Sequence, residues 1–390
     1  MPVKNRFAEL LPEITGWRHD FHSHPELQYD VHHTAGRVAE LLRGFGIDEV
    51  VEGVGQTGVV GVIRGRQDGS GKVIGLRADM DALPIIEATG LDYASTVPGK
   101  MHACGHDGHT SMLLGTAKYL AETRNFDGTA VLIFQPAEEG GAGARTMLED
   151  GLLDRWNIQE FYGLHNMPGV PVGEFAICEG PMLGAADEFE ITVTGRGGHA
   201  AQPHMCTDTM LAAAQIIVAL QSIVSRNVDP LKSGVVSCCA VEGDSTAHNV
   251  IPGTVTIRGT ARSLAEDVRE LQASAIRRVA ENTARAFGAE AVVDYHTGYP
   301  VTVNHPEPTR HAIETAITVA GAQKVNDAYT PIMAGEDFSF MLNARPGAYI
   351  FLGNGDSAPL HHPEYNFADE AIPFGSSWLA AMVEARMPAA

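Results

Sequence analysis

The stretch "MHACGHDGHT" at residues 101–110 carries one thiol, three imidazoles and one carboxylate. A cysteine beside histidines can be a nucleophile with its base, a thiolate ligand of a metal ion, or a small buried apolar residue. These ten residues alone do not distinguish the three hypotheses. The partners that each chemistry requires must come from the rest of the chain.

The metal hypothesis makes the most demanding prediction about the other residues. A metal ion held by thiolate and imidazole needs further ligands, and a site that activates water also needs a carboxylate that acts as base. Suitable side chains stand in the glycine-kinked loop that holds Cys104 and His106 and after predicted strands, and one of two neighbouring glutamates can bind metal while the other activates water. The candidates are Cys104, His106, Glu138, Glu139, His165 and His361.

The nucleophile hypothesis gives the thiolate of Cys104 a histidine as its base, as in cysteine hydrolases. It leaves the two glutamates and His361 without a role. A glutamate pair is usually a solvated face, but this one follows an apolar strand and precedes two glycines. We therefore favour the metal site, and we expect His102, His109 and His362 to be supporting or surface groups.

The surrounding pattern indicates a sheet that presents these groups at its edge. Short β-branched runs at 57–64 and 73–77 predict strands, 108–123 has the periodicity of a helix, and a further strand ends at Gln135. In open α/β sheets, ligands bind at the carboxyl ends of the strands. The acidic stretches "ADMD" and "PAEEGG" and the segment "GLHNMPG" all stand at such ends.

From residue 186 the pattern changes to strands of alternating polarity, with predicted helices at 206–226 and 264–287. The order β-α-β-β-α-β is that of a small ferredoxin-like unit. After Pro300 the rhythm of a larger α/β domain resumes. We predict an α/β protein with a discontinuous domain, 1–185 and 299–390, into which 186–298 are inserted.

The composition agrees with two domains and restricts the kinds of partner that the protein can bind. A chain of 390 residues with 44% hydrophobic content buries a large core. The net charge of −21 disfavours nucleic acid and anionic membranes, and the apolar run at 210–220 is shorter than the roughly 20 residues of a membrane span. No signal peptide is expected, the five cysteines are expected to be reduced, and the expected location is the cytoplasm.

The motifs together resemble one known family. In order they are "HSHPEL", "LRADMDALP", "HACGHDGHT", "IFQPAEEG", "GLHNMP", "GRGGHAAQPH", "HNVIP", "GTARS", "GEDFS" and "LHHPEY". They are similar to those of the metal-dependent amidohydrolases related to hippurate hydrolase, N-acyl-amino-acid amidohydrolases and auxin-conjugate hydrolases, over residues 15–375. The resemblance implies a mixed-sheet, zinc-exopeptidase-like catalytic domain and a ferredoxin-like lid through which the chain forms a homodimer.

The resemblance also implies how the site works. Two divalent metal ions, zinc, manganese, cobalt or nickel, would be bridged by the thiolate of Cys104. Glu138 would be the catalytic base, and Asp79 and Asp81 would orient ligands from behind them. Glu336 and Asp337 are expected to line the pocket. The other metal ligands would be His106, Glu139, His165 and His361.

Three residues of the insert resemble lid groups that act on the substrate. His199 would reach the neighbouring active site and stabilise the oxyanion, while Asn249 and Arg262 would hold substrate oxygens or a carboxylate. Each also has a structural explanation. Asn249 could cap a loop ahead of a proline, and Arg262 could be a charge at a strand end.

The predicted reaction is hydrolysis of the amide bond of an N-acyl amino acid to a carboxylic acid and a free amino acid. A second hypothesis keeps the site but makes the enzyme a dipeptidase or a deacylase of a diamino acid, such as succinyl-diaminopimelate. The thiolate in "HACGHD" counts against it, because those relatives usually carry an aspartate-containing motif. A third hypothesis is a binding protein that has lost activity, which is disfavoured because no ligand position is replaced.

Overall fold

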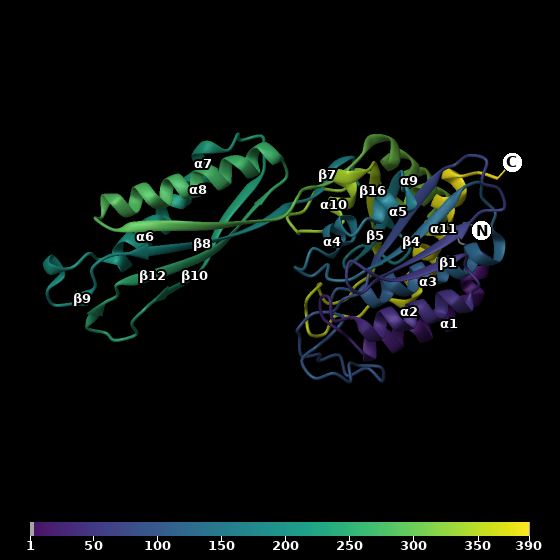
Figure 1. The fold of residues 1–390 in the computed structure, drawn as a ribbon, viewed down its shortest axis with the longest axis horizontal. Helices are drawn as coiled ribbons and strands as arrows, with labels where there is room; N and C mark the ends of the chain where they lie inside the picture. Colours follow the sequence, from purple (N-terminus) through teal and green to yellow (C-terminus); the bar gives the residue numbers. More distant parts are fainter. Residues whose placement is uncertain (1–3, 390) are drawn as a thin grey trace. The chain divides into compact units, whose positions relative to one another are not determined.

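The structure is a computed structural model that describes residues 4–389, and the chain divides into two compact units. The first unit comprises residues up to 180, residues 303–330 and those from 337 onward, and the inserted unit comprises 181–302 and 331–336. Figure 1 shows both in the colours of the sequence. The short return of the chain to the inserted unit at 331–336 was not predicted from the sequence.

An eight-stranded mixed sheet forms the centre of the first unit (Figure 1), which confirms the predicted α/β class. In order across the sheet its strands are β1 (Glu49–Val54), β2 (Gly58–Arg64), β4 (Thr129–Gln135), β3 (Val73–Asp79), β5 (Glu160–Met167), β16 (Gly347–Gly353), β6 (Phe175–Ala176) and β15 (Val325–Asn326). Strand β3 runs parallel to β4 and β5, and β5 runs parallel to β16. These four central strands are buried along most of their length, which explains why their sequences are continuously apolar.

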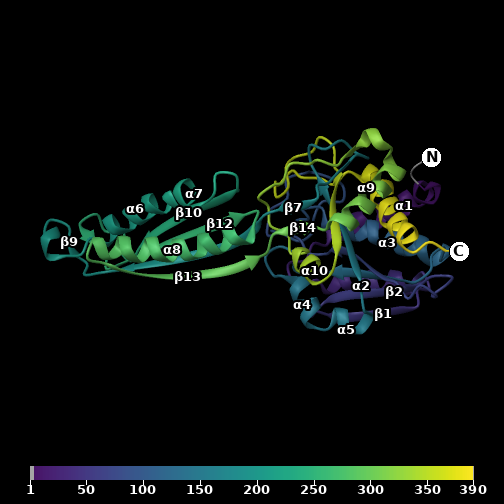
Figure 2. The same cartoon turned by 90° about the horizontal axis from the view of Figure 1, so that it is seen from above.

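Helices pack on this sheet, and Figure 2 shows them from a second direction. They are α1 (Asn5–Ser23), α2 (His32–Gly44), α3 (His106–Thr123), α4 (Gly143–Glu149), α5 (Leu152–Trp156), α9 (Pro306–Ala320), α10 (Ser339–Ala344) and α11 (Ile372–Arg386), with short 3-10 turns at Ala322–Lys324 and Asp369–Ala371. Helix α3 packs against α1, α11 and the sheet. Its residues are buried on nearly every side through Ala117, so the helix that begins in the histidine-rich stretch is part of the core.

The inserted unit is a four-stranded antiparallel sheet packed against three helices. Its elements are β8 (Ala185–Thr194), β9 (Gly198–His199), α6 (Thr209–Leu220), α7 (Ser222–Asn227), β10 (Gly234–Gly243), β11 (Val250–Ile251), β12 (Thr254–Ser263), α8 (Glu266–Ala286) and β13 (Glu290–Tyr299), with a 3-10 turn at Pro203–Met205. The strand order β10-β12-β8-β13 is that of the predicted ferredoxin-like unit. Two further short strands, β7 (Gly180–Leu183) and β14 (Thr302–Asn304), stand where the chain passes between the units.

The helix predicted at 206–226 is two helices, α6 and α7. Helix α6 begins at Thr209, later than predicted, because the carboxylate of Asp208 caps it by accepting a hydrogen bond from Leu211 N at 2.9 Å. Together they form one stretch, Thr209–Asn227, that is long and apolar enough to cross a membrane by length and composition alone. Its inner side, which includes Ile216 and Leu220, packs in the core of the inserted unit.

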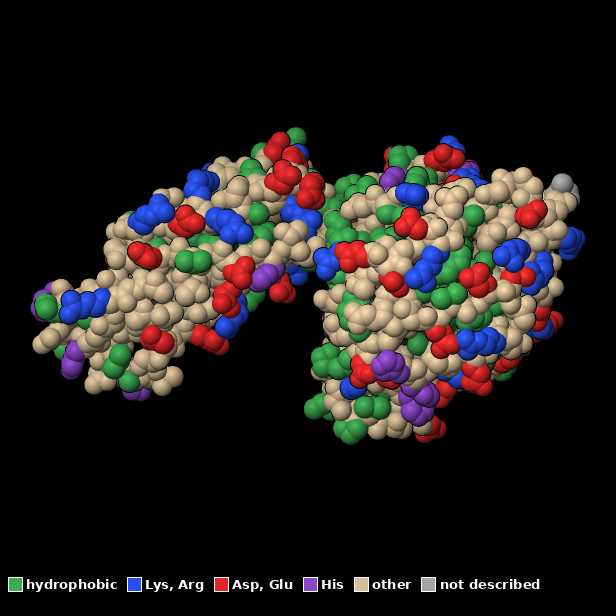
Figure 3. Space-filling model, viewed as in Figure 1, with side chains coloured by type: hydrophobic (Ala, Val, Ile, Leu, Met, Phe, Trp, Pro, Cys, Tyr) green, Lys and Arg blue, Asp and Glu red, His purple; other side chains and the backbone are tan. Residues whose placement is uncertain are grey.

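The outer surface of the inserted unit is partly apolar. Met210, Leu211 and Val218 on α6 are exposed, as are Val235 and Val241 on the edge strand β10. Figure 3 shows acidic and basic side chains interspersed over the visible face of each unit. The exposed apolar side chains of α6 form a surface that no other described residue of this chain covers.

Candidate metal centre

The carboxyl ends of the parallel strands β3, β4, β5 and β16 meet at one edge of the sheet of the first unit. The structure brings to this edge all six of the residues that the sequence predicted as metal ligands and base. Their donor atoms form overlapping groups in which all atoms lie within 4.8 Å of one another. These groups are Cys104, His106 and His165; Cys104, Glu139 and His361; and His106, Glu138 and Glu139.

Cys104 is common to two of these groups, one with His165 and one with His361. Its Sγ lies 3.4 Å from Nε2 of His165. Burial raises the pKa of the Cys104 thiol well above its usual value, and the neighbouring carboxylates of Glu139 and Glu138 raise it further. A thiol in these surroundings ionises only with a cation beside it, so its setting is that of a metal ligand and not of an activated nucleophile.

The two buried histidines of the cluster each have one nitrogen fixed by a backbone carbonyl. His106 Nδ1 lies 2.8 Å from the carbonyl oxygen of Asp81, and His165 Nδ1 lies 2.6 Å from that of Asn166. Each ring thereby presents Nε2 to the cluster, which is the arrangement typical of histidines that bind metal. His106 is the first residue of α3 and His165 lies inside β5, whereas the sequence placed them in a loop and after a strand.

The two glutamates lie in a tight turn after β4 that one aspartate holds in place. The carboxylate of Asp81 accepts hydrogen bonds from the backbone N–H of Glu138 at 2.9 Å and of Glu139 at 3.1 Å. Gly140 has a φ of 93°, which lets the chain turn directly after the pair. Both glutamate side chains are therefore fixed at their backbone before any ligand binds.

Glu139 faces two imidazoles. Its Oε1 lies 3.5 Å from His361 Nε2 and 4.0 Å from His106 Nε2. Burial alone would raise the pKa of Glu139, but His361 and His106 outweigh it and hold the pKa below its usual value. The pKa of His106 is shifted in the opposite direction. Burial alone would lower it, but the carboxylates of Asp79, Asp81 and Glu139 raise it to about 10.

His361 lies on the open side of the cluster, with 54% of its side chain exposed. Its backbone has a φ of 66°, in the left-handed region that residues other than glycine rarely adopt. Its N–H donates to the carbonyl oxygen of Ala103 at 2.8 Å, which ties the "LHH" loop to the "HACGHD" turn. That bond holds the strained backbone in place and brings His361 to Cys104.

A chain of hydrogen bonds lies behind the converging donors; it contains Asp79 and His109, which were expected there, and Asn166 and Tyr365, which were not. His109 Nδ1 lies 2.6 Å from the Asp79 carboxylate, and Asn166 N donates to His109 Nε2 at 2.9 Å. The amide of Asn166 donates to the carbonyl oxygen of Cys104 at 2.6 Å and accepts from the hydroxyl of Tyr365 at 2.7 Å. Asn166 and Tyr365 stand in the quoted motifs "GLHNMP" and "LHHPEY", so only their place in the motifs could have indicated them.

This support explains the glycine after Cys104. Gly105 has a φ of 89°, and a Cβ there would lie 2.3 Å from Asn166 Nδ2 and 2.5 Å from the hydroxyl oxygen of Tyr365. The other two histidines of the stretch are both buried. His109 belongs to the supporting chain, and burial lowers the pKa of His102 to about 3.

Asp337, which was expected to line the pocket, is buried and hydrogen-bonded inside the first unit. Its two carboxylate oxygens accept hydrogen bonds from Arg77 at 2.9 Å, from Gln135 at 2.8 and 2.9 Å, and from Ala144 N at 2.9 Å. Arg77 also donates to Asp79 at 2.7 Å. Asp337 therefore neutralises a buried guanidinium at the end of the sheet and joins β3 to β4.

The donor set fits a pair of divalent metal ions. His106 Nε2 and Glu139 Oε1 are buried and have no hydrogen-bond partner among the described residues, although burial of such atoms without a partner costs about 1–3 kcal/mol each. Both belong to the groups of converging donors. One thiol, three imidazoles and one carboxylate suit zinc and other borderline cations, so the residues present fit the predicted group.

The predicted substrate residues of the inserted unit are separated within it. His199 on β9 pairs with Val250 on β11, and Ala200 N donates to Asn249 O at 2.9 Å, so His199 and Asn249 are neighbours. Arg262 lies near the other end of β12 from Thr254. With a rise of about 3.3 Å per residue, the eight steps along β12 from Thr254 to Arg262 span about 26 Å.

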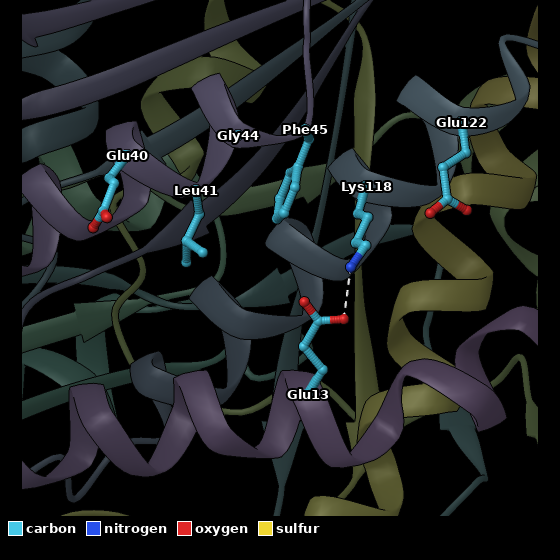
Figure 4. Close-up of a pocket in the computed structure, with 7 residues that line it drawn as sticks. All are labelled: Glu13, Glu40, Leu41, Gly44, Phe45, Lys118 and Glu122. Atoms are coloured by element: carbon cyan, nitrogen blue, oxygen red, sulfur yellow. Dashed lines mark hydrogen bonds and ion pairs between the residues drawn. The ribbon is translucent and has the colours of Figure 1, made fainter.

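A further hollow on the first unit has no comparable chemistry (Figure 4). It is lined by Glu13, Glu40, Leu41, Gly44, Phe45, Lys118 and Glu122. Lys118 Nζ is paired with Glu13 at 2.6 Å. The hollow lacks a nucleophile, a histidine or a cysteine, and we assign it no function.

The comparisons with known proteins agree with this site. The model of the peptidase family M20/M25/M40 matches residues 75–385. The hippurate hydrolase of Campylobacter jejuni is 43% identical over 96% of this chain and 96% of its own. An N-acetylcysteine deacetylase of Bacillus subtilis is 40% identical over 95% of each chain. The chain therefore belongs to peptidase family M20/M25/M40 and is an amide-cleaving hydrolase.

A solved structure supports the same fold. It is a dinuclear metal binding peptidase from the M20 family of Bacillus subtilis, with a TM-score of 0.84 and 35% identity over 97% of this chain and 99% of that one. One further relative bears on the second hypothesis. An N-acetyldiaminopimelate deacetylase of Streptococcus sanguinis is 37% identical over 92% of this chain and 94% of its own.

Proposed function

We propose that this chain is a metal-dependent N-acyl-amino-acid amidohydrolase. The observation that carries the proposal is the convergence of one thiol, three imidazoles and two carboxylates at one sheet edge, where two buried donor atoms have no hydrogen-bond partner among the described residues. The names of the relatives, a hippurate hydrolase and an N-acetylcysteine deacetylase, support the substrate class. Water and the amide would give a carboxylic acid and a free amino acid.

Cys104, His106, Glu139, His165 and His361 would hold two divalent metal ions. Cys104 belongs to two of the groups of converging donors, so its thiolate would be a ligand that the two groups share. When bound, the ions would supply Lewis-acid polarisation of the scissile carbonyl and lower the pKa of water from about 15.7 towards about 7. Zinc, manganese, cobalt and nickel are all compatible with this donor set.

Glu138 would be the general base. Its carboxylate groups with His106 and Glu139, and Asp81 fixes its backbone, so it is positioned beside the ligands. In the reaction, Glu138 accepts a proton from the attacking water and passes it to the nitrogen of the leaving amine. Burial of the side chain excludes competing water from that carboxylate.

His199, Asn249 and Arg262 would act from the inserted unit. His199 donates to the oxyanion, and Asn249 and Arg262 bind substrate oxygens. The span of about 26 Å along β12 supports a site that receives His199 and Asn249 from one subunit and Arg262 from the other, because one small substrate cannot reach both ends of β12. Nη1 of Arg262 donates to the carbonyl oxygens of Asp187 at 3.3 Å and Ala261 at 3.2 Å, which fixes one end of the guanidinium.

A homodimer through the inserted unit is part of the same proposal. The exposed Met210, Leu211 and Val218 on α6, together with the unpaired edge of β10, offer an apolar surface that a second copy can cover. This use also accounts for the apolar outer side of α6 without a membrane. We propose a cytoplasmic enzyme that binds neither nucleic acid nor membrane, in keeping with the net charge of −21.

The decisive experiment is a hydrolysis screen after reconstitution of metal-free protein with zinc, manganese, cobalt or nickel. The substrates are benzoyl, acetyl, long-chain acyl and indole-acetyl amino acids, with N-acetyl- and N-succinyl-diaminopimelate and dipeptides as the alternatives. Metal-dependent release of a free amino acid from the first set is expected. Preference for a diaminopimelate or a dipeptide would favour the second hypothesis, and no hydrolysis with any metal would overturn the proposal.

A further inference from the structure

A second group of potential metal ligands lies on the first unit, apart from the candidate metal centre. Asp20, His24 and His33 each offer a donor atom, and the three atoms lie within 4.8 Å of one another. His24 directly follows α1 and His33 is in the first turn of α2, so the group joins the end of one helix to the start of the next. The rings of His24 and His33 have centroids 4.9 Å apart.

The backbone around this group is already ordered. His24 Nδ1 lies 2.8 Å from the carbonyl oxygen of Asp20 and 3.3 Å from its carboxylate. The carboxylate of Glu26 accepts hydrogen bonds from His33 N at 3.0 Å and from Thr34 N at 2.9 Å, which fixes the start of α2. Little chain movement is then needed for the three side chains to converge on one ion.

Charge and exposure also suit a cation. His24 and Asp20 have 46% and 37% of their side chains exposed, so an ion can reach them from solvent. Arg37 lies 3.8 Å from the Asp20 carboxylate, but its closer partner is Glu40 at 2.6 Å, so Asp20 can exchange this long contact for a metal. Two imidazoles and one carboxylate, with water in the fourth position, are a set that zinc, nickel and copper prefer.

We propose that Asp20, His24 and His33 form a second, surface-exposed site for a borderline divalent cation, which ties α1 to α2. The segment between the two histidines touches the loops of the candidate metal centre. Ala82 N donates to Glu26 O at 2.7 Å, and Ala137 N donates to Gln28 O at 3.1 Å. An ion at this site therefore stabilises the first unit along the border of those loops.

The test measures zinc bound per chain by equilibrium dialysis and elemental analysis, on enzyme whose tight metal content is already complete. The wild type is expected to bind one further zinc ion per chain, and the double variant His24→Asn, His33→Asn is expected to lose that ion while it keeps its tight metal and its hydrolytic rate. The matched control is His296→Asn, which removes an exposed histidine 3.2 Å from Asp294 in the inserted unit. Its zinc content should equal that of the wild type.

A second measurement uses the wild type alone, so it does not depend on how the double variant folds. Excess zinc should protect His24 and His33 from modification by diethyl pyrocarbonate, mapped by peptide mass spectrometry, and should leave His296 reactive. Equal zinc binding by wild type and double variant, or no protection of His24 and His33, would overturn the proposal. Neither result depends on which amide the enzyme cleaves.

Discussion

The two units set their candidate functional groups in opposite surroundings. In the first unit Cys104, His106 and Glu138 are buried and held by hydrogen bonds from several elements. In the inserted unit His199 and Asn249 are exposed, and their neighbouring contacts come from local backbone. The donor atoms of the first set converge within one chain, whereas His199 and Asn249 face solvent, and we propose that they act only when a second subunit approaches them.

The largest expected effect is on the buried base. Glu138→Gln keeps the shape of the side chain but cannot accept the proton, so kcat should fall about 10²–10⁴-fold while metal content stays unchanged. Steady-state kinetics and elemental analysis of the same sample measure both. Glu364→Gln, which alters an exposed glutamate near His362, is the matched control and should behave as the wild type. Near-normal turnover in Glu138→Gln would remove Glu138 from the mechanism.

The next largest effect is expected from His199, one of the exposed candidate residues of the inserted unit. His199→Ala should lower kcat about 10²–10³-fold, the usual loss for one oxyanion donor, and should leave the melting temperature unchanged because the side chain is exposed. Kinetics and thermal unfolding check the two parts. A fall in stability equal to the fall in activity would mean that His199 has a structural role.

Mixed dimers decide whether His199 acts on the other subunit. When His199→Ala and Glu138→Gln chains are co-expressed, half of the random dimers contain one of each, and one of their two sites carries neither change. Activity should then return to about a quarter of the wild-type value. Activity no higher than that of the two variants alone would mean that each site uses its own His199 or none.

A smaller effect is expected from the support behind the ligands. In Asp81→Asn the amide can accept only one of the two hydrogen bonds that the carboxylate accepts from Glu138 N and Glu139 N. Metal affinity should fall about 10–100-fold, while kcat at saturating metal changes much less. A metal titration followed by activity separates the two quantities. Unchanged affinity would show that the turn holds its shape without Asp81.

The comparison also explains what the sequence could predict. The convergence of Glu139, His165 and His361 could be predicted because each was placed after a predicted strand, and parallel strands bring such ends together. The ferredoxin-like insert was found because alternating strands and long helices have distinct periods. Both signals lie within short stretches of the sequence, so they can be recognised without knowing how the chain packs.

The remaining features depend on contacts between distant segments. Asn166 and Tyr365 are ordinary polar residues in sequence, and only their meeting at Gly105 shows that they support Cys104. Asp337 was expected to line the pocket from the family resemblance alone, and only the structure shows that Arg77 and Gln135 bind it inside the protein. The spacing of residues in the sequence does not show which side chains from distant segments will form hydrogen bonds with one another.

The smallest predicted effect is on the free energy of unfolding, and it compares one ion pair from each unit. Glu160 pairs with Arg386 at 2.6 Å with 13% of either side chain exposed, whereas Asp267 and Lys232 in the inserted unit are 63% and 40% exposed. Burial alone would raise the pKa of Glu160, but Arg386, Lys72 and Tyr162 lower it from 4.5 to about 2. Because the folded pKa lies below the ordinary value, this stabilisation is present above pH 4.5 and is lost as the pH falls towards 2.

Glu160→Gln should therefore lower the free energy of unfolding by about 1–2 kcal/mol at pH 7, a figure reduced for solvent screening of a partly exposed pair. The difference from the wild type should shrink as the pH falls from 4.5 towards 2, because the wild-type carboxylate becomes protonated in that range. Urea unfolding at several pH values measures it, and Asp267→Asn is the control, with little change expected at any pH. If both variants lost the same free energy, exposure would not distinguish the ion pairs of the two units, and the contrast between a fixed first unit and an exposed inserted unit would be confined to the candidate metal centre.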